Sequence, residues 1–141
     1  MKNTLRPGLE HTLSFPVPDS KTVPALYPEA PEFQAMPEVF ATGFLVGLVE
    51  WTCIQAVNPH LDWPQEQTVG THVNLSHEAA TPVGMEVTVR VRLRDVGGRR
   101  LLFDVDASDQ ADTISQRNHQ RFVIDTERFT RTMETKRTAA T

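Results

Sequence analysis

Apolar and polar positions recur with two different periods along this chain, first helical and then extended. In residues 40–57 apolar side chains recur at helical spacing, and Asn58-Pro59 ends the pattern. Pro37-Glu38 precedes it, and both residues suit the first turn of a helix. The helix, placed at 39–58, is apolar on nearly all sides, so we expect it to be buried on most of them.

From residue 68 onward the period is two, which is typical of half-buried strands. Strands are expected at 68–76, 85–95, 101–107 and 114–124, with a short additional one at 9–15. Within 85–95, valine and leucine alternate with glutamate, threonine and arginine, which predicts one apolar and one solvated face. Gly97-Gly98 predicts a hairpin turn into the next strand.

One long helix and five strands predict an α+β fold, in which a central helix is wrapped by a curved antiparallel sheet of about five strands. This is the hotdog arrangement, although other α+β folds share the same order of elements. The 141 residues suit a single domain, 1–141. Segment 1–38 holds seven of the ten prolines, so it should form no long helix. After the short strand 9–15 it should be irregular, wrap the domain and provide a lid. The sheet should span 68–124, and the polar tail 126–141 should hold only a short helical turn around 127–129 before it frays.

Composition and charge narrow the classes of function. The net charge is −4, whereas a nucleic-acid binder needs a basic surface, so no nucleic-acid partner is expected. The longest apolar run, 39–57, is too short and too often interrupted to span a bilayer, and residues 1–18 lack the apolar centre of a signal peptide. These features predict a cytoplasmic protein without a membrane partner. Cys53 is the single cysteine and lies in an apolar run, which favours a buried, unreactive thiol.

Glu50 is the most informative polar residue, because it lies in the middle of the apolar helix. Its neighbours three and four residues away are Val46, Gly47, Cys53 and Ile54. An ionised carboxylate on an apolar face is costly unless it is paired or hydrogen-bonded. The position suits a general base or nucleophile, and the alternative is a glutamate that reaches solvent or caps a neighbouring backbone.

His77 is the second candidate, at the end of the strand 68–76. Val73, Leu75 and His77 alternate with polar residues, so His77 should continue a core-facing row. A neutral imidazole there could accept a proton at physiological pH, although a hydrogen-bonded core histidine is the simpler explanation. His72 should face the opposite side, so the two histidines do not form a metal site. The chain also lacks HExxH, CxxC and phosphate-loop motifs, and neither a metal nor a redox cofactor is expected.

Thr42 lies at the predicted start of the helix. A threonine there is commonly an N-cap, and its functional alternative is a nucleophile or substrate positioner beside the free backbone N–H groups of the first turn. Thr42 and Glu50 are eight residues apart, which is about 12 Å along a helix. They can therefore meet only if the start of the helix bends or if a partner subunit contributes one of the two.

Three blocks of sequence carry a resemblance to a known family. They read KTVPALYPEAPEF at 21–33, PEVFATGFLVGLVEW at 37–51 and GTHVNLSHEAATPVG at 70–84, and GRR at 98–100 and the stretch 119–121 also match. On these blocks the chain resembles the fluoroacetyl-CoA thioesterases from about residue 7 to residue 129. The resemblance implies a hotdog-fold homodimer with its active site at the subunit interface.

The resemblance also implies roles for particular residues. It suggests Thr42, Glu50 and His77 as the catalytic set. Gly70 would lie beside the thioester carbonyl, where a glycine permits close approach of the backbone. Arg121 matches a family arginine and would touch the coenzyme.

Phe33 would belong to an aromatic lid over the acyl group. The family has a second phenylalanine three residues later, where this chain has the flexible Met36. Thioester hydrolysis is therefore expected, whereas selectivity for a fluorinated acyl group is left open.

The function predicted at this point is hydrolysis of a short-chain acyl-CoA, with fluoroacetyl-CoA as one candidate, to the free acid and coenzyme A. The coenzyme is part of the substrate, and no other cofactor is needed. Two alternatives are a non-catalytic hotdog module that binds acyl-CoA, and a hotdog hydratase or dehydratase that acts on a carbon–carbon double bond.

Overall fold

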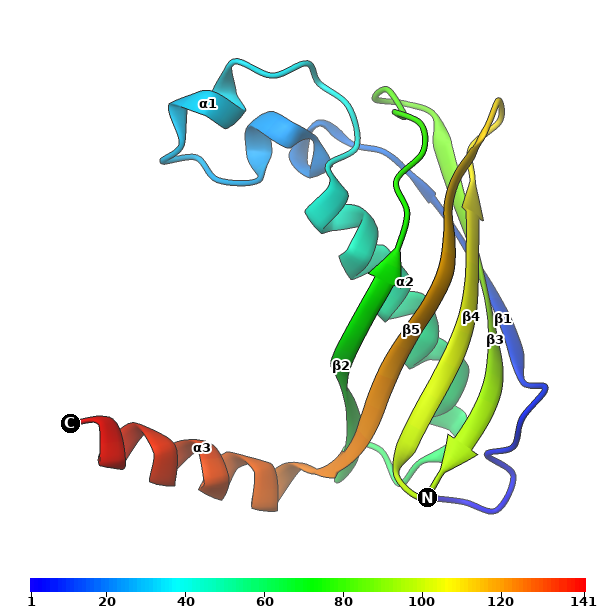
Figure 1. The fold of residues 1–141 in the computed structure, drawn as a ribbon, viewed down its shortest axis with the longest axis vertical. Coiled ribbons are helices and arrows are strands. Elements are labelled where there is room, and N and C mark those ends of the chain that lie inside the picture. The colour runs from blue at the N-terminus through cyan, green and yellow to red at the C-terminus, as the bar shows by residue number, and fades with distance from the viewer.

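The computed structural model describes residues 1–141 and shows a curved antiparallel sheet wrapped around one long helix (Figure 1). In chain order the elements are β1 (Glu10–Pro16), η1 (Asp19–Lys21), η2 (Val23–Ala25), α1 (Pro31–Gln34), α2 (Thr42–Val57), η3 (Asn58–His60), β2 (Glu66–Leu75), β3 (Glu86–Gly97), β4 (Arg100–Ser108), β5 (Thr113–Asp125) and α3 (Thr126–Ala140), where η marks a short 3-10 helix. The strands lie in the order β1-β3-β4-β5-β2, and all neighbouring pairs are antiparallel. The predicted α+β hotdog fold is therefore confirmed.

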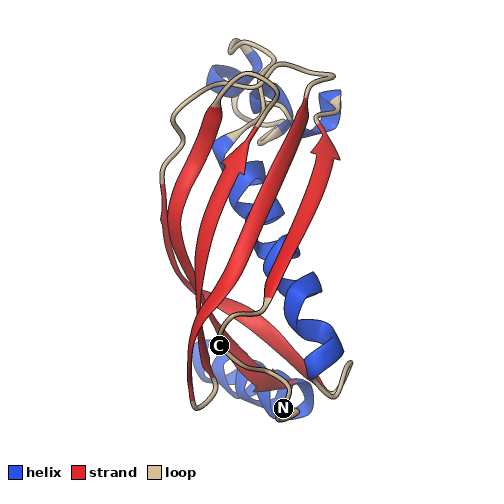
Figure 2. Ribbon diagram, turned by 90° about the vertical axis from the view of Figure 1, so that its right-hand side faces the viewer, coloured by secondary structure: helices blue, strands red, loops and turns tan.

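The core lies between α2 and the concave face of the sheet, and in Figure 2 the strands cross in front of the helix. In β3, Val87 and Val89 point toward the helix and are fully buried, as the alternation of the sequence predicts. They pack in one cluster with Leu45 and Val49 of α2. On the outer face, three arginines of β3 form ion pairs with acids of the neighbouring strands: Arg90 with Asp106, Arg92 with Glu10 and Arg94 with Asp104. This face is solvated, as expected.

One side of α2 is left open by the chain. Gly43, Gly47 and Trp51 are exposed, and Trp51 keeps 47% of its accessible surface. The prediction that this helix is buried on most sides is therefore wrong for the single chain. The reason is geometric, because a half-open sheet covers only the side of the helix that it curves around.

The strand β2 forms an edge of the sheet and carries a bulge. It pairs only with β5, with Gly70 opposite Arg121 and His72 opposite Gln120, so Thr71 is the extra residue. Inward-facing and outward-facing residues alternate along a strand, and the extra residue shifts this alternation by one position. Gly70 before the bulge and Val73 after it therefore both face α2. Val73 nevertheless keeps 47% of its surface exposed, because no element of this chain covers the edge.

The C-terminal segment forms a 15-residue helix, α3, so the prediction of a short turn followed by a frayed tail is wrong. Asp125 supplies the N-cap, since its side chain accepts a hydrogen bond from the backbone N–H of Arg128, and Glu127 lies in the positive first turn. Figure 1 shows α3 standing away from the sheet, opposite the segment that holds α1. No helix in the structure is both long enough and apolar enough to cross a membrane.

Candidate active site

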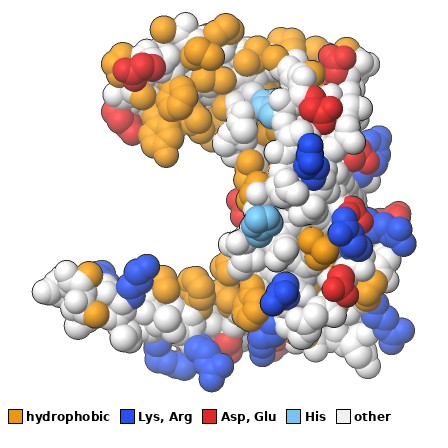
Figure 3. Space-filling model, viewed as in Figure 1, with side chains coloured by type: hydrophobic (Ala, Val, Ile, Leu, Met, Phe, Trp, Pro, Cys, Tyr) orange, Lys and Arg blue, Asp and Glu red, His pale blue; other side chains and the backbone are white.

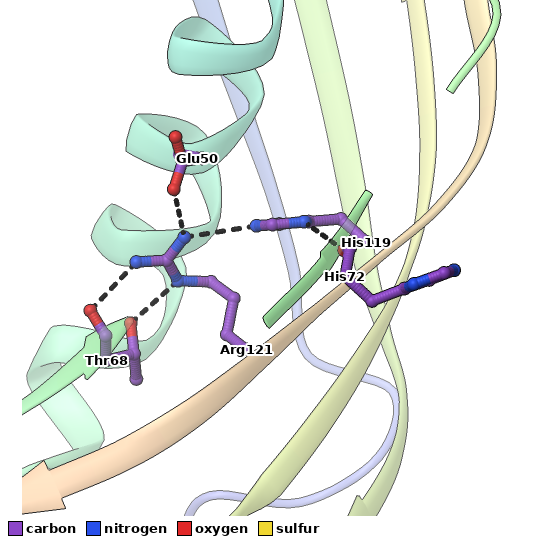
Figure 4. Close-up of polar contacts among 5 residues, drawn as sticks. All are labelled: Glu50, Thr68, His72, His119 and Arg121. Carbon is purple, nitrogen blue, oxygen red and sulfur yellow. Dashed lines mark hydrogen bonds and ion pairs between the residues drawn. The ribbon is translucent and has the colours of Figure 1, made fainter. Parts of the chain in front are cut away.

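Glu50 lies on the open side of α2, and the buried guanidinium of Arg121 holds its carboxylate (Figure 4). Arg121 Nη1 donates a hydrogen bond to Glu50 Oε2 at 3.0 Å. The Arg121 side chain is 3% exposed and the Glu50 side chain is 38% exposed, so the ion pair runs from the core to the surface. This pairing explains how a carboxylate is tolerated on an apolar helix. Oε1 makes no hydrogen bond within the chain and is available at the surface.

Arg121 is itself fixed by Thr68 and His119. Its Nε donates to Thr68 Oγ1 and its Nη2 to the Thr68 carbonyl, both at 2.8 Å. Nη1 also lies 3.1 Å from His119 Nε2. Within the chain Arg121 is thus buried and held by Thr68, and it binds Glu50. The contact with the coenzyme that the resemblance implies stays a prediction.

Gly70 lies against the Glu50 carboxylate. A Cβ atom built at this glycine would lie 2.8 Å from Glu50 Oε2 and 3.3 Å from His119 Cε1. Only a residue without a side chain leaves the carboxylate in its observed place. The backbone of β2 therefore forms one wall of the space around Glu50.

Thr42 and His77 form a second group. Thr42 Oγ1 lies 2.7 Å from His77 Nδ1, and Thr42 is exposed at the first position of α2. The N-cap position belongs to Ala41, so the Thr42 hydroxyl serves the histidine and not the helix terminus. The strand β2 ends at Leu75, so His77 lies in the following loop and not in the strand as predicted. A hydroxyl bonded to an imidazole is the geometry of an activated nucleophile or of a proton relay.

Burial lowers the pKa of His77, and a contact with the backbone of Ala79 opposes the shift. The imidazole is therefore neutral at physiological pH and can accept the Thr42 proton. Cys53 lies below this surface, and burial raises the pKa of its thiol to about 12. The cysteine is protonated and unreactive at neutral pH, in line with the sequence analysis.

The two groups are separate within one chain. The helix α2 is continuous from Thr42 to Val57, so Thr42 and Glu50 remain about 12 Å apart along it. The hydrogen bond of Thr42 is to His77, and that of Glu50 is to Arg121. The sequence left open two ways for Thr42 and Glu50 to meet, a bent start of the helix or a contribution from a partner subunit. The bent start is not observed.

Comparison with known proteins identifies the family. The family model described as fluoroacetyl-CoA-specific thioesterase (FlK) matches residues 21–127. The fluoroacetyl-CoA thioesterase of Streptantibioticus cattleyicolor is 51% identical over 129 residues, which are 92% of each protein. This chain belongs to the fluoroacetyl-CoA-specific thioesterase family.

Solved structures agree with this membership. A structure of FlK superposes with a TM-score of 0.90 at 49% identity and covers 94% of this chain and 97% of its own. A thioesterase superfamily member from Thermus thermophilus, at 23% identity, gives a TM-score of 0.81 with coverage of 96% and 97%. A hot-dog-like protein from Thermanaerovibrio acidaminovorans, at 18% identity, gives 0.78 with coverage of 92% and 91%. The last two support the fold alone.

The segment between β1 and α2, which was predicted to form a lid, contains the short helices η1, η2 and α1. Val23 donates its backbone N–H to the Val39 carbonyl, so the two ends of this segment are held together. The ring of Phe33 stacks on Tyr27 with centroids 5.9 Å apart, whereas Met36 is 49% exposed. A mostly apolar hollow of about 190 Å³ lies between this segment and α2, lined by residues such as Phe40, Phe44 and Trp51. A larger hollow, about 460 Å³, is on the outer face of the sheet among ion-paired residues such as Arg90 and Asp106.

The roles of Thr68 and His119 were not predicted from the sequence. Both are buried polar residues on inward-facing rows, Thr68 on β2 and His119 on β5. The sequence does contain a sign of this arrangement. His119, Arg121 and Val123 are spaced two apart, so the two polar side chains lie on the same face of the strand as an apolar valine. The structure arranges no three His, Cys, Asp or Glu side chains as a metal site.

The buried histidine makes the stability of the fold depend on pH. Burial lowers the pKa of His119 from its ordinary value near 6.5, and the charge of Arg121 adds to this, while the bond to the His72 carbonyl opposes it. Below about pH 6.5 the unfolded chain takes up a proton that the folded chain refuses, so the free energy of unfolding should fall, by at most about 1.4 kcal/mol per pH unit. Above that pH the full contribution of the neutral His119 to the free energy of unfolding is present.

Urea unfolding of the wild type and of His119→Gln at about pH 7.5 and about pH 5.5 checks this expectation. The variant should lose less stability on acidification, since it lacks the group, while His77 contributes equally to both proteins. Equal losses in the two proteins would show that His119 does not carry the effect.

Proposed function

We propose that this protein hydrolyses the thioester bond of a short acyl-CoA, to give the free acid and coenzyme A. Water supplies the oxygen that ends on the acid and the hydrogen that ends on the thiol. The observation that carries the proposal is the Glu50 carboxylate, anchored through Oε2 by a buried arginine and open at Oε1, in a chain of this thioesterase family. An anchored carboxylate with one open oxygen suits attack on a carbonyl, directly or through a water molecule.

In this proposal the thioester carbonyl lies beside Gly70. At this glycine the backbone lies against Glu50, since even a methyl group there would overlap the carboxylate. The acyl thioester would approach along this backbone wall toward the open Oε1 of Glu50. Backbone N–H groups of this wall and of the first turn of α2 are the donors proposed for the oxyanion.

Thr42 and His77 handle protons in this proposal. The neutral imidazole accepts a proton through the Thr42 hydroxyl, which lies 2.7 Å from Nδ1, and returns it to the leaving thiolate. Thr42 is exposed, so its hydroxyl can also contact the substrate. The scheme uses side chains and water, with coenzyme A entering as part of the substrate.

The active site is proposed to form between two copies of the chain. Strand β2 has an unpaired edge, and its inward-facing Val73 is exposed, which favours pairing with the β2 strand of a second copy. A two-fold axis would then place two α2 helices side by side and antiparallel. In that arrangement the start of one helix, with Thr42, lies beside the middle of the other, with Glu50.

The surface of the molecule fits a second copy. Figure 3 shows a hollow between the lid and α3, with apolar side chains on both of its walls. Exposed apolar residues of these two elements are Tyr27 and Met36 in the lid and Phe129 and Met133 in α3. The homodimer would cover them. Coenzyme A substrates and a single buried thiol fit the proposed cytoplasmic location.

Release of free thiol from a panel of acyl-CoA esters tests the proposed reaction. The panel contains acetyl-, fluoroacetyl-, propionyl- and butyryl-CoA, with an enoyl-CoA to detect hydration. Thiol release with a strong preference for fluoroacetyl over acetyl would show that Met36 preserves the selectivity named for the relatives. Release without this preference would assign another short acyl group. Binding of esters without thiol release would favour a binding module, and hydration alone would favour a hydratase.

A further inference from the structure

His119 is a buried histidine that the proposed reaction does not use. It lies on β5 with no exposed surface, and its ring stands between the backbone of β2 and Arg121 (Figure 4). Nδ1 lies 2.8 Å from the His72 carbonyl oxygen, and Nε2 lies 3.1 Å from Arg121 Nη1. Both ring nitrogens are therefore engaged.

These two contacts fix the protonation of the ring. A carbonyl oxygen can only accept a hydrogen bond, so Nδ1 carries the hydrogen. A guanidinium can only donate, so Nε2 presents a lone pair to Arg121. His119 is thus the neutral Nδ1–H tautomer, and it acts on Arg121 as a hydrogen-bond acceptor.

The acceptor controls how Arg121 holds Glu50. Arg121 Nη1 has two N–H groups, of which one points to Glu50 Oε2 and the other to His119 Nε2. Arg121 Nη2 is engaged by the Thr68 carbonyl. Arginine and carboxylate otherwise tend to form a two-pronged pair that occupies both carboxylate oxygens. Here only Oε2 is engaged, and the second N–H of the nitrogen that holds it is directed to His119.

We propose that His119 is a positioning residue, which accepts a hydrogen bond from Arg121 Nη1 and so fixes the orientation of the group that holds Glu50 Oε2, while Oε1 is left open to the acyl group. The inference rests on the proposed hydrolysis only for its effect on turnover. The hydrogen-bonded arrangement itself can be tested without substrate.

Two variants of His119 separate its two hydrogen bonds. In His119→Gln the side-chain oxygen can reach the place of Nε2 and accept from Arg121, while the bond to His72 is lost. In His119→Asn the amide can still donate to the His72 carbonyl, while the acceptor for Arg121 is lost. Each variant removes one hydrogen bond and introduces an amide, and thermal unfolding of both shows whether they are equally stable.

The expected result is that the glutamine variant keeps kcat within about threefold of the wild type. The asparagine variant should lose about 10-fold to 100-fold in kcat, which corresponds to one hydrogen bond to a charged group, with a KM close to the wild-type value. Equal losses in both variants would mean that His119 serves only the packing of the fold, and this would overturn the proposal.

NMR of the Arg121 guanidinium provides the readout that does not need turnover. Separate, slowly exchanging Nη resonances are expected in the wild type and the glutamine variant, and averaged resonances in the asparagine variant. This pattern supports the positioning role even if no acyl-CoA is hydrolysed, in which case only the proposed reaction fails. The same Arg121 spectrum in all three proteins would overturn the inference, whatever the turnover.

Discussion

Replacing Glu50 with glutamine is expected to lower kcat by about 10²-fold to 10⁴-fold, the range that general acid–base groups contribute. The amide keeps an oxygen that can accept from Arg121 Nη1, so the buried guanidinium retains a partner. It cannot take a proton from water or attack a carbonyl as a carboxylate does. The chain should therefore still fold, with a loss of about 1–3 kcal/mol in the free energy of unfolding.

Single-turnover thiol release together with thermal unfolding measures both effects. Glu86→Gln is the matched control, because Glu86 is exposed at the start of β3 and its side chain makes no hydrogen bond or ion pair. It should turn over acyl-CoA as the wild type does. Turnover of Glu50→Gln at the wild-type rate would remove the carboxylate from the mechanism.

Adding one methyl group at Gly70 is the second change expected to have a large effect. In Gly70→Ala the new Cβ would lie 2.8 Å from Glu50 Oε2, which is closer than such contacts allow, so the carboxylate must shift. Because the contact is with the end of a flexible side chain, the fold should tolerate it. A displacement approaching 1 Å at a reacting group costs about 10²-fold in rate, so we expect kcat to fall by about 10-fold to 100-fold.

Gly97→Ala controls for the loss of a glycine from a strand. A Cβ at Gly97 meets no atom within 4 Å, and the backbone there is not in the left-handed region, so activity and stability should stay near the wild type. If Gly70→Ala turned over acyl-CoA as fast as Gly97→Ala, the observed contact of Gly70 with Glu50 would have no part in catalysis.

The fold was predictable from the sequence in those segments whose pattern of apolar and polar residues fits only one kind of secondary structure. The apolar segment that ends at Asn58-Pro59 had to be a helix, and the alternation around Val87 and Val89 had to be a strand with one buried face. The length of α3 was not predicted, because its sequence is mostly polar and its only large apolar residues, Phe129 and Met133, are too short a pattern to indicate a 15-residue helix. The sequence does mark the start of this helix with the N-cap residue Asp125, but this residue was not used in the prediction.

The site was predictable in its residues but not in its connections. An isolated carboxylate in an apolar helix singled out Glu50, since such a group needs a partner. The partner, Arg121, lies 71 residues away, and which strand brings it to α2 depends on the order of strands in the sheet. The bulge at Thr71 decides which residues of β2 face Glu50. Its phase shift was not visible in the sequence, because Val69 and Val73 are both apolar although they face opposite sides of the sheet.

The separation of Thr42 from Glu50 leads to the most direct test of the account, whose central claim is an active site shared by two chains. Thr42→Val and Glu50→Gln chains with different tags are produced together, and the mixed dimers are purified through both tags. A shared site predicts that each mixed dimer holds one intact site of two, built from Thr42 and His77 of one chain and Glu50 of the other. Mixed dimers should then release thiol at about half the wild-type rate, although each variant alone is nearly inactive. Mixed dimers as inactive as the two parents would show that each site lies within a single chain, and would contradict the account.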